Sequence, residues 1–296
     1  MKIAFIGSVE FSFHTLKHLL TIPEVEIVGV VTRKSSSFNS DFCSLESLAS
    51  AAGVPCFIAE ANEQSQMAEW LSCLAPDVIY CFGWSYLLKK EILSLANLGV
   101  VGYHPAALPF NRGRHPIIWA LCLGLKETGS TFFFMDEGAD SGDVLDQKIV
   151  KIDSCDDAKS LYDKLTGVAI SQISSFTYKL SQNNFKRYPQ DHSKANYWRK
   201  RNKDDGLIDW RMSALCIYNL VRALTKPYIG AHCEYLGTDR KVWKIDFSPI
   251  DCQYENYEPG KVIKIKEGMI TVKCGEGAVV LVEHEINPLP KEGEYL

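Results

Sequence analysis

A histidine stands where an apolar run ends in the segment VVGYHPAALPFNRGRHPIIWAL, residues 100–121. The run is typical of the end of a buried strand, and a Pro-rich, basic loop follows His104 before a helical pattern begins. Histidine changes its charge near neutral pH, so at the end of a strand it can act as a general acid or base. A single histidine is more often structural than catalytic, and its position is what makes His104 a candidate for proton transfer.

The second segment with chemistry-bearing side chains is the acidic turn DEGADSGD, residues 136–143. It brings three aspartates and two glycines into one loop between two predicted strands, with Asp140 near its middle. A carboxylate held beside an imidazole fixes its tautomer and stabilises its charged form. The alternatives are a tight polar turn or a calcium loop, and the calcium loop lacks the terminal Glu and the spacing of an EF-hand.

The composition is that of an ordinary globular protein, with 296 residues, 46% apolar and 23% charged, and a net charge of −4. This charge gives no general attraction to phosphate polymers, so nucleic acid is an unfavoured partner. No apolar run approaches the roughly 18–20 residues of a spanning helix, and the N-terminus favours a strand over a signal peptide. The ten scattered cysteines contain no CxxC pair, which predicts free thiols in the cytoplasm, no metal site and no membrane partner.

Short apolar runs alternate with helical patterns through the first part of the chain. The runs at 2–7, 26–32, 54–59, 77–82 and 99–104 predict strands. Near-continuous apolar strands separated by helices indicate a parallel sheet covered on both faces, which is a doubly wound, Rossmann-like α/β domain. Such sheets bind ligands beyond the carboxyl ends of their strands, so the loops after the first, fourth and fifth runs should converge at one edge.

The rest of the chain predicts a second, smaller domain. Residues 129–152 favour two strands joined by the acidic turn, and 157–182 favour one long amphipathic helix. The polar, aperiodic stretch 183–206 is interpreted as a connection, and short strands within 230–287 indicate a small β-barrel. The predicted domains are therefore 1–190 (catalytic), 191–205 (linker) and 206–296 (a helix plus the barrel).

Taken together, these segments resemble the N10-formyltetrahydrofolate-dependent formyltransferases over nearly the whole chain. Gly102-Tyr103-His104, Leu108-Pro109, Arg112-Gly113 and DEGADSGD stand where the family has Asn-x-His, Leu-Pro, Arg-Gly and an acidic turn. DDGLIDW at 204–210 and then LVRAL, KPYIGA and KVWK match the C-terminal part. The resemblance implies a formyltransferase domain followed by a small β-barrel, and formyl transfer from N10-formyltetrahydrofolate without a metal.

The resemblance also implies roles for individual residues. His104 would transfer the proton, with Asp140 as its partner. The residues that would lie against the folate are Tyr86, Leu87, Leu88, Arg114, Asp136, Glu137, Gly138, Ala139 and Asp140.

Gly102 departs from the family pattern, which has an asparagine whose amide stabilises negative charge on the formyl oxygen. Losing one such donor typically costs about 10²–10³ in rate. Tyr103, Asn111, Ser141 or protonated His104 could replace it. Gly102 could also leave room for a larger acceptor, a water molecule or a neighbouring side chain.

The family differs in the amine that receives the formyl group, which can belong to initiator methionyl-tRNA, a nucleotide-linked amino sugar or a purine precursor. The tRNA enzymes carry a long basic loop after the second strand, whereas RKSSSFNSDFC at 33–43 has one basic pair, Arg33 and Lys34. One pair is weak for a polyanion that needs several phosphate contacts. RGRHPIIWAL and RNKDDGLIDW resemble the enzymes that formylate nucleotide-linked amino sugars.

The prediction is therefore an amino-sugar N-formyltransferase whose partners are the folate and a nucleotide sugar. The candidate substrate-binding residues are Ser8 at a helix start, Gly102, and Arg112 and Arg201 for the diphosphate. Methionyl-tRNA formylation, hydrolysis of formyltetrahydrofolate and binding with little turnover stay open as alternatives, and so does a homodimer.

Overall fold

The computed structural model describes residues 1–36, 40–60, 64–248 and 254–296, which form two compact units. Unit 1 comprises residues 1–116, 128–151 and 163–199, and unit 2 comprises residues 117–127, 152–162 and 200–296. The two units are therefore interleaved along the chain, because the chain leaves unit 1 twice before the final segment begins at Lys200. No helix within the described residues is long and apolar enough to span a membrane.

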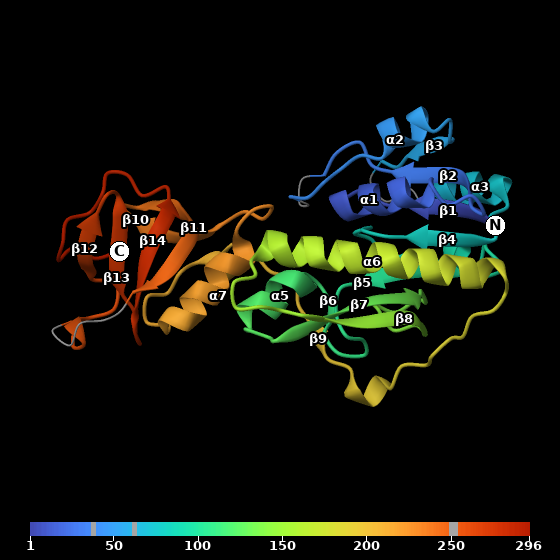
Figure 1. Cartoon of the computed structure of the whole chain (residues 1–296). Helices are drawn as coiled ribbons and strands as arrows, with labels where there is room; N and C mark the ends of the chain where they lie inside the picture. The colour runs from blue at the N-terminus through green and yellow to red at the C-terminus, as the bar shows by residue number, and fades with distance from the viewer. Residues whose placement is uncertain (37–39, 61–63, 249–253) are drawn as a thin grey trace. The chain divides into compact units, whose positions relative to one another are not determined.

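Unit 1 is built on a seven-stranded sheet with the order β3-β2-β1-β4-β5-β7-β8 (Figure 1). Its strands are β1 (Lys2–Ile6), β2 (Glu26–Thr32), β3 (Cys56–Ile58), β4 (Val78–Cys81), β5 (Val100–His104), β7 (Glu127–Phe134) and β8 (Val144–Lys151). The α-helices within the described residues are α1 (Glu10–Leu19), α2 (Glu46–Ala51), α3 (Gln64–Leu74), α4 (Lys90–Leu93), α5 (Pro116–Cys122), α6 (Ala158–Ser181) and α7 (Ala214–Leu224).

The alternation of side chains along each strand gives the sheet two different covered faces. On one face Ala4, Ile6 and Ile79 pack in an aliphatic cluster with Met67 of α3 and Ile92 of α4. The other face is aromatic: Phe82 contacts Phe5 at a ring separation of 5.6 Å and Tyr80 at 5.2 Å. Tyr80 also meets Phe176 of α6 at 5.8 Å. Helices therefore cover both faces of the sheet, as the apolar strands predicted.

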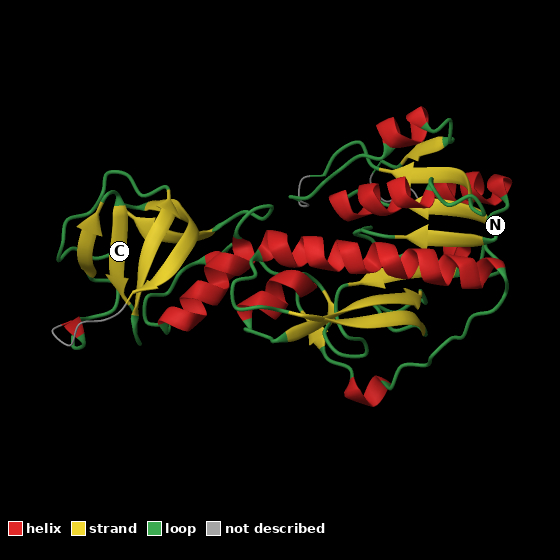
Figure 2. Ribbon diagram, viewed as in Figure 1, coloured by secondary structure: helices red, strands yellow, loops and turns green. Residues whose placement is uncertain are grey.

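Unit 2 contains a five-stranded antiparallel sheet with the order β10-β11-β14-β13-β12, labelled in Figure 1. Figure 2 draws its strands in yellow. Its strands are β10 (Ala231–Tyr235), β11 (Thr238–Ser248), β12 (Val262–Lys266), β13 (Met269–Lys273) and β14 (Ala278–His284). Helix α7 is tied to the early segment of the same unit, because the Arg222 guanidinium donates to the carbonyls of Asp153 at 3.2 Å and Asp156 at 2.9 Å. The predicted small β domain of the barrel type is confirmed.

The sheet of unit 1 and its connections have three further local features. Strand β7 runs antiparallel to β5, so the sheet is mixed rather than wholly parallel. The segment between β4 and α4 is not helical, and the Gln64 side chain holds it by donating to the Leu87 carbonyl and accepting from Lys89 N, both at 2.7 Å. The polar stretch 183–206 contains strand β9 (Tyr197–Trp198), which pairs in parallel with β6 (Arg112–Gly113).

Candidate active site

The carboxyl ends of β1, β4 and β5 lie next to one another at one edge of the sheet, because these strands are adjacent and parallel. Helix α1, which follows β1, contacts the loop after β4, since the Ser12 hydroxyl donates to the Phe82 carbonyl at 2.6 Å. The same hydroxyl accepts from Val9 N at 3.2 Å. The predicted convergence of these loops is confirmed, and His104 is the last residue of β5.

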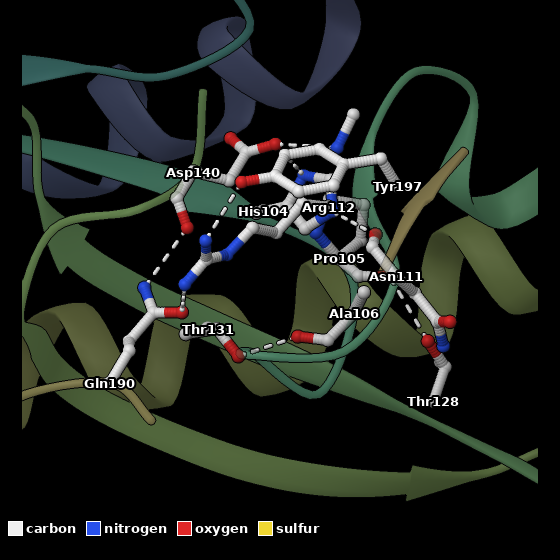
Figure 3. A network of polar contacts seen from close by, with 11 residues as sticks. His104, Pro105, Ala106, Asn111, Arg112, Thr128, Thr131, Asp140, Gln190 and Tyr197 are labelled. Carbon is white, nitrogen blue, oxygen red and sulfur yellow. Dashed lines mark hydrogen bonds and ion pairs between the residues drawn. The ribbon is translucent and has the colours of Figure 1, made fainter. Parts of the chain in front are cut away.

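His104 lies between two acceptors and is 4% exposed (Figure 3). Its Nε2 donates to the Asn111 carbonyl at 2.7 Å, and its Nδ1 is 3.5 Å from Asp140 Oδ2. A neutral imidazole carries one N–H and can satisfy one of these oxygens, whereas the imidazolium can donate toward both. Both ring nitrogens therefore face oxygen atoms, an arrangement that suits a group that takes up and returns a proton.

Asp140 is held at the tip of the acidic turn in the left-handed backbone region, with φ 55°. Its Oδ2 accepts from Gly113 N at 2.8 Å, which fixes the carboxylate beside the imidazole. Asp136 stabilises the turn itself, because its Oδ1 accepts from Gly138 N at 3.0 Å and from the Ser141 hydroxyl at 2.6 Å. The described residues contain no group of metal-binding side chains, and the turn's own donors use the Asp136 oxygen.

Gly113 is required both for its backbone conformation and for its lack of a side chain. Its φ is 103°, and a Cβ at this position would lie 2.3 Å from the Trp198 carbonyl oxygen. Gly113→Ala should therefore lower the free energy of unfolding by about 1–3 kcal/mol. It should also lower activity at the site, because the N–H that holds Asp140 must move.

The matched control is Gly53→Ala, which has φ 67° but no atom within 4 Å of the added Cβ. Denaturant unfolding and turnover of both variants separate the backbone strain from the collision. Equal turnover in the two variants would show that Gly113 N does not position Asp140.

The space beside Gly102 is filled by neighbouring side chains. A Cβ on Gly102 would lie 2.8 Å from Met135 Cγ and 3.1 Å from Phe133 Cζ. Because Gly102 and His104 are two residues apart on β5, they share a face of the sheet. Met135 therefore occupies the volume into which a side chain at position 102 would extend.

The three neighbours considered as a replacement donor lie in different surroundings. Tyr103 lies on the opposite face of β5, stacks on Phe11 at 4.2 Å and accepts from the Ser130 hydroxyl at 3.2 Å. Burial raises the pKa of Tyr103, so its hydroxyl keeps its proton. The Ser141 hydroxyl donates to Asp136, and the Asn111 side chain accepts from Asn196 Nδ2 at 3.1 Å.

The residues expected to contact folate fall in two groups. Leu88 is buried and Leu87 is 59% exposed, while the Tyr86 hydroxyl accepts from Arg33 at 2.8 Å. Arg114 donates to the Ser85 carbonyl at 3.1 Å, which brings it to this loop. The second group, Asp136, Glu137, Gly138, Ala139 and Asp140, forms the acidic turn.

The candidate substrate-binding residues are placed in several different environments. Ser8 is buried, and its carbonyl accepts from Cys43 N at 3.0 Å, while Glu10 N at the start of α1 is bonded to the Asp41 carbonyl at 2.9 Å. Arg201 belongs to unit 2, where its guanidinium lies 4.7 Å above the Trp119 ring. Arg112 is 1% exposed, and its guanidinium is bonded within the protein, a placement that suits a structural role rather than a diphosphate contact.

The segment 190–198, which we name the strap, was not recognised from the sequence as part of the site. Its Gln190, Asn196 and Tyr197 contact the segment that follows His104 or the acidic turn. A polar stretch as long as 183–206 without a pattern of its own is unusual inside a compact domain, and such loops are frequently functional. That length, combined with amide and aromatic side chains, was the available signal.

Comparison with known proteins identifies the family. The chain matches the model "Formyl transferase" over residues 1–175 and "Formyl transferase, C-terminal domain" over residues 200–289. A methionyl-tRNA formyltransferase of Caldanaerobacter subterraneus subsp. tengcongensis is 34% identical over 303 residues, covering 100% of this chain and 96% of that protein. The corresponding protein of Acetivibrio thermocellus is 30% identical over 96% of this chain and 91% of its own length.

Solved structures share the fold at lower identity. An N-formyltransferase from Helicobacter canadensis in complex with folinic acid and dTDP-3-aminofucose is similar with a TM-score of 0.70 at 17% identity, covering 95% of this chain and 98% of that chain. Methionyl-tRNA formyltransferase from Clostridium thermocellum has a TM-score of 0.60 at 17% identity, covering 84% and 94%. The family matches, which span both parts of the chain and include the His104 edge of the sheet, show that the protein belongs to the formyl transferase family and is a formyltransferase.

Proposed function

We propose that the protein transfers a formyl group from N10-formyltetrahydrofolate to the amine of a nucleotide-linked amino sugar, in a catalytic part spanning residues 1–190. The observation that carries the proposal is His104, held between Asp140 Oδ2 and the Asn111 carbonyl at the ligand-binding edge of the sheet. An amine that attacks the formyl carbon must lose a proton, and the folate nitrogen that leaves must gain one. His104 takes the first proton as a base and returns it as an acid, and Asp140, 3.5 Å from Nδ1, orients the ring.

The residues near Leu88 suit a folate. Trp84 Nε1 is a buried donor with no hydrogen-bond partner among the described residues, and Trp84 packs on the same cluster as Leu88 and Met135. A buried donor without a partner costs free energy, so an acceptor supplied by a ligand would stabilise it. A pterin ring has several such acceptors and a flat face for the surrounding apolar side chains.

The charge distribution supports a small acceptor over tRNA. Residues 206–296 carry 11 Lys and Arg against 13 Asp and Glu, so this part of the chain offers no basic surplus. In the loop 33–43, Arg33 turns to the Tyr86 hydroxyl and lies 5.3 Å from that ring, whereas residues 37–39 lie outside the described residues. Affinity for a nucleic acid grows with the number of phosphates neutralised, and residues 206–296 supply no surplus of cations for that task.

Methionyl-tRNA formylation is the second candidate function. It is favoured by the two full-length relatives, which are named methionyl-tRNA formyltransferases at 34% and 30% identity. The proteins named as sugar formyltransferases share 17% identity in the structures, which supports the common fold alone. The choice between the acceptors therefore depends on a direct comparison of turnover.

A panel of acceptors tests the proposal. The protein is incubated with N10-formyltetrahydrofolate and, separately, nucleotide-linked amino sugars or charged initiator tRNA, and formylated products are quantified by mass spectrometry. We expect kcat/KM for the best sugar to exceed that for methionyl-tRNA by about tenfold or more. Faster formylation of methionyl-tRNA would reverse the assignment, and formate released at the same rate without any amine would identify a hydrolase.

We propose a cytoplasmic location for the enzyme. The nine described cysteines are all free thiols. Burial raises the pKa of Cys81 to about 12 and that of Cys56 to about 11, which keeps both thiols protonated and unreactive. A homodimer stays a prediction.

A further inference from the structure

We propose that the strap, residues 190–198, is part of the catalytic apparatus, and that Gln190 and Asn196 are positioning residues for Asp140 and His104. The inference rests on the proposed roles of His104 and Asp140, and it applies to any acceptor amine. It extends the catalytic part of the chain beyond residue 190 and into the stretch expected to be a linker.

Gln190 holds the acidic turn from its backbone side (Figure 3). Its Nε2 donates to the Asp140 carbonyl at 3.0 Å and to the Gly142 carbonyl at 2.6 Å. Its Oε1 accepts from Arg112 Nη2 at 2.7 Å, and the residue is 8% exposed. Because a left-handed residue such as Asp140 persists only where its surroundings hold it, these two bonds set the direction of the Asp140 carboxylate.

Asn196 holds Asn111, whose carbonyl lies on the other side of the imidazole. Its Oδ1 accepts from Asn111 N at 2.8 Å, and its Nδ2 donates to Asn111 Oδ1 at 3.1 Å. The backbone of Asn111 is also left-handed, with φ 62°, and its carbonyl accepts the hydrogen bond from His104 Nε2. The strap therefore positions the partners of both ring nitrogens of His104, one through Gln190 and one through Asn196.

The hydrogen bonds of Arg112 show that the strap packs against the segment that follows His104. The guanidinium donates to the Tyr197 hydroxyl at 2.9 Å and to His192 Nδ1 at 3.2 Å, in addition to Gln190. None of these three partners is a carboxylate, and Arg112 Nε has no partner among the described residues. A buried cation is costly unless it is hydrogen-bonded, so displacing the strap would remove the groups that stabilise Arg112.

Two substitutions at Gln190 distinguish its hydrogen bonds to the acidic turn from its hydrogen bond to Arg112. Gln190→Met keeps the side-chain length but loses all three hydrogen bonds. Gln190→Glu keeps an oxygen for Arg112 and adds an ion pair, but it cannot donate to the Asp140 and Gly142 carbonyls. The fold of Gln190→Glu should therefore be at least as stable as that of Gln190→Met, while the turn is released in both.

Gln172→Met is the matched control. Gln172 is another fully buried glutamine of unit 1, and its Nε2 donates to the Ser130 carbonyl at 3.1 Å and to Asp146 Oδ2 at 2.9 Å. The change is chemically the same, and none of its hydrogen bonds reaches His104 or Asp140. A loss of activity that follows general destabilisation would appear in this variant as well.

We expect kcat of Gln190→Met and Gln190→Glu to fall by about 10- to 100-fold, because a catalytic group displaced by about 1 Å loses activity on that scale. The KM for N10-formyltetrahydrofolate should change little, and Gln172→Met should keep its kcat within a few-fold. The second readout is the imidazole ¹H–¹⁵N spectrum, in which His104 is assigned by its absence from His104→Asn. The His104 signals should move in both Gln190 variants and stay in place in the control.

The two measurements distinguish this inference from the proposed function. His104 signals that move while kcat stays at the wild-type level would uphold the positioning role and reject His104–Asp140 as the proton-transferring pair. Unchanged His104 signals would overturn the inference, whatever happens to turnover. An equal loss of kcat in Gln172→Met would also overturn the inference.

Discussion

Replacing His104 with asparagine should lower formyl transfer by about 10²–10⁴-fold, the usual contribution of a positioned general acid–base group. The asparagine amide cannot accept the proton of the attacking amine. The variant should stay folded, because the side chain lies at the end of β5 and not within the aromatic face of the core. The measurement is single-turnover formyl transfer at saturating donor with the best acceptor.

The control is His14→Asn, an exposed histidine on α1 of the same unit. Thermal unfolding of both variants reports whether either change disturbs the fold. If His104→Asn turned over within a few-fold of the wild-type protein, proton transfer would have to be assigned to another group.

Gly102→Asn should not restore activity, although it rebuilds the sequence motif of the family. The structure gives the reason: a Cβ here lies 2.8 Å from Met135 Cγ and 3.1 Å from Phe133 Cζ, so the amide cannot take its place without displacing them. Inserting atoms into a filled site costs about 1–3 kcal/mol. We expect a loss of stability in this range and a fall in turnover of about tenfold, because shifts at residue 102 propagate along the strand to His104.

Met135→Ala tests the cause of this effect. It removes the side chain that fills the space, so the double variant Gly102→Asn with Met135→Ala should recover part of the stability lost by Gly102→Asn alone. The two changes are in contact and should be non-additive, which a double-mutant cycle measures. A rise in turnover of tenfold or more in Gly102→Asn alone would instead show that the glycine is a lost donor, and that the site has decayed.

The sequence predicted those parts of the fold that depend on local patterns. Apolar runs gave the strands of unit 1, because a strand buried on both faces needs an apolar side chain at nearly every position, as in VIYC of β4. The carboxyl ends of parallel strands meet at one edge of a sheet, so the position of His104 at the end of a strand indicated where it would lie. The acidic turn was also visible as a local cluster around Asp140.

The parts that were not predictable depend on contacts between distant residues. Asn111 and Asn196 are 85 positions apart, and neither side chain has a pattern that announces the pair. The burial of Arg112 could not be anticipated either, because arginine is usually exposed and the strap that covers it has no apolar periodicity. The filling of the space beside Gly102 by Met135 required the register of β5 against β7.

The interleaving of the two units constrains how such a protein can be recombined. Helix α7 lies after Lys200, but the carbonyls that receive the Arg222 guanidinium belong to residues 153–156, far upstream. A chimera joined at residue 200 would bring a foreign C-terminal part without the upstream segment that its own α7 requires. Exchange of acceptor preference between relatives through a single crossover is therefore hindered, and lineages that diverge in substrate should inherit both segments together.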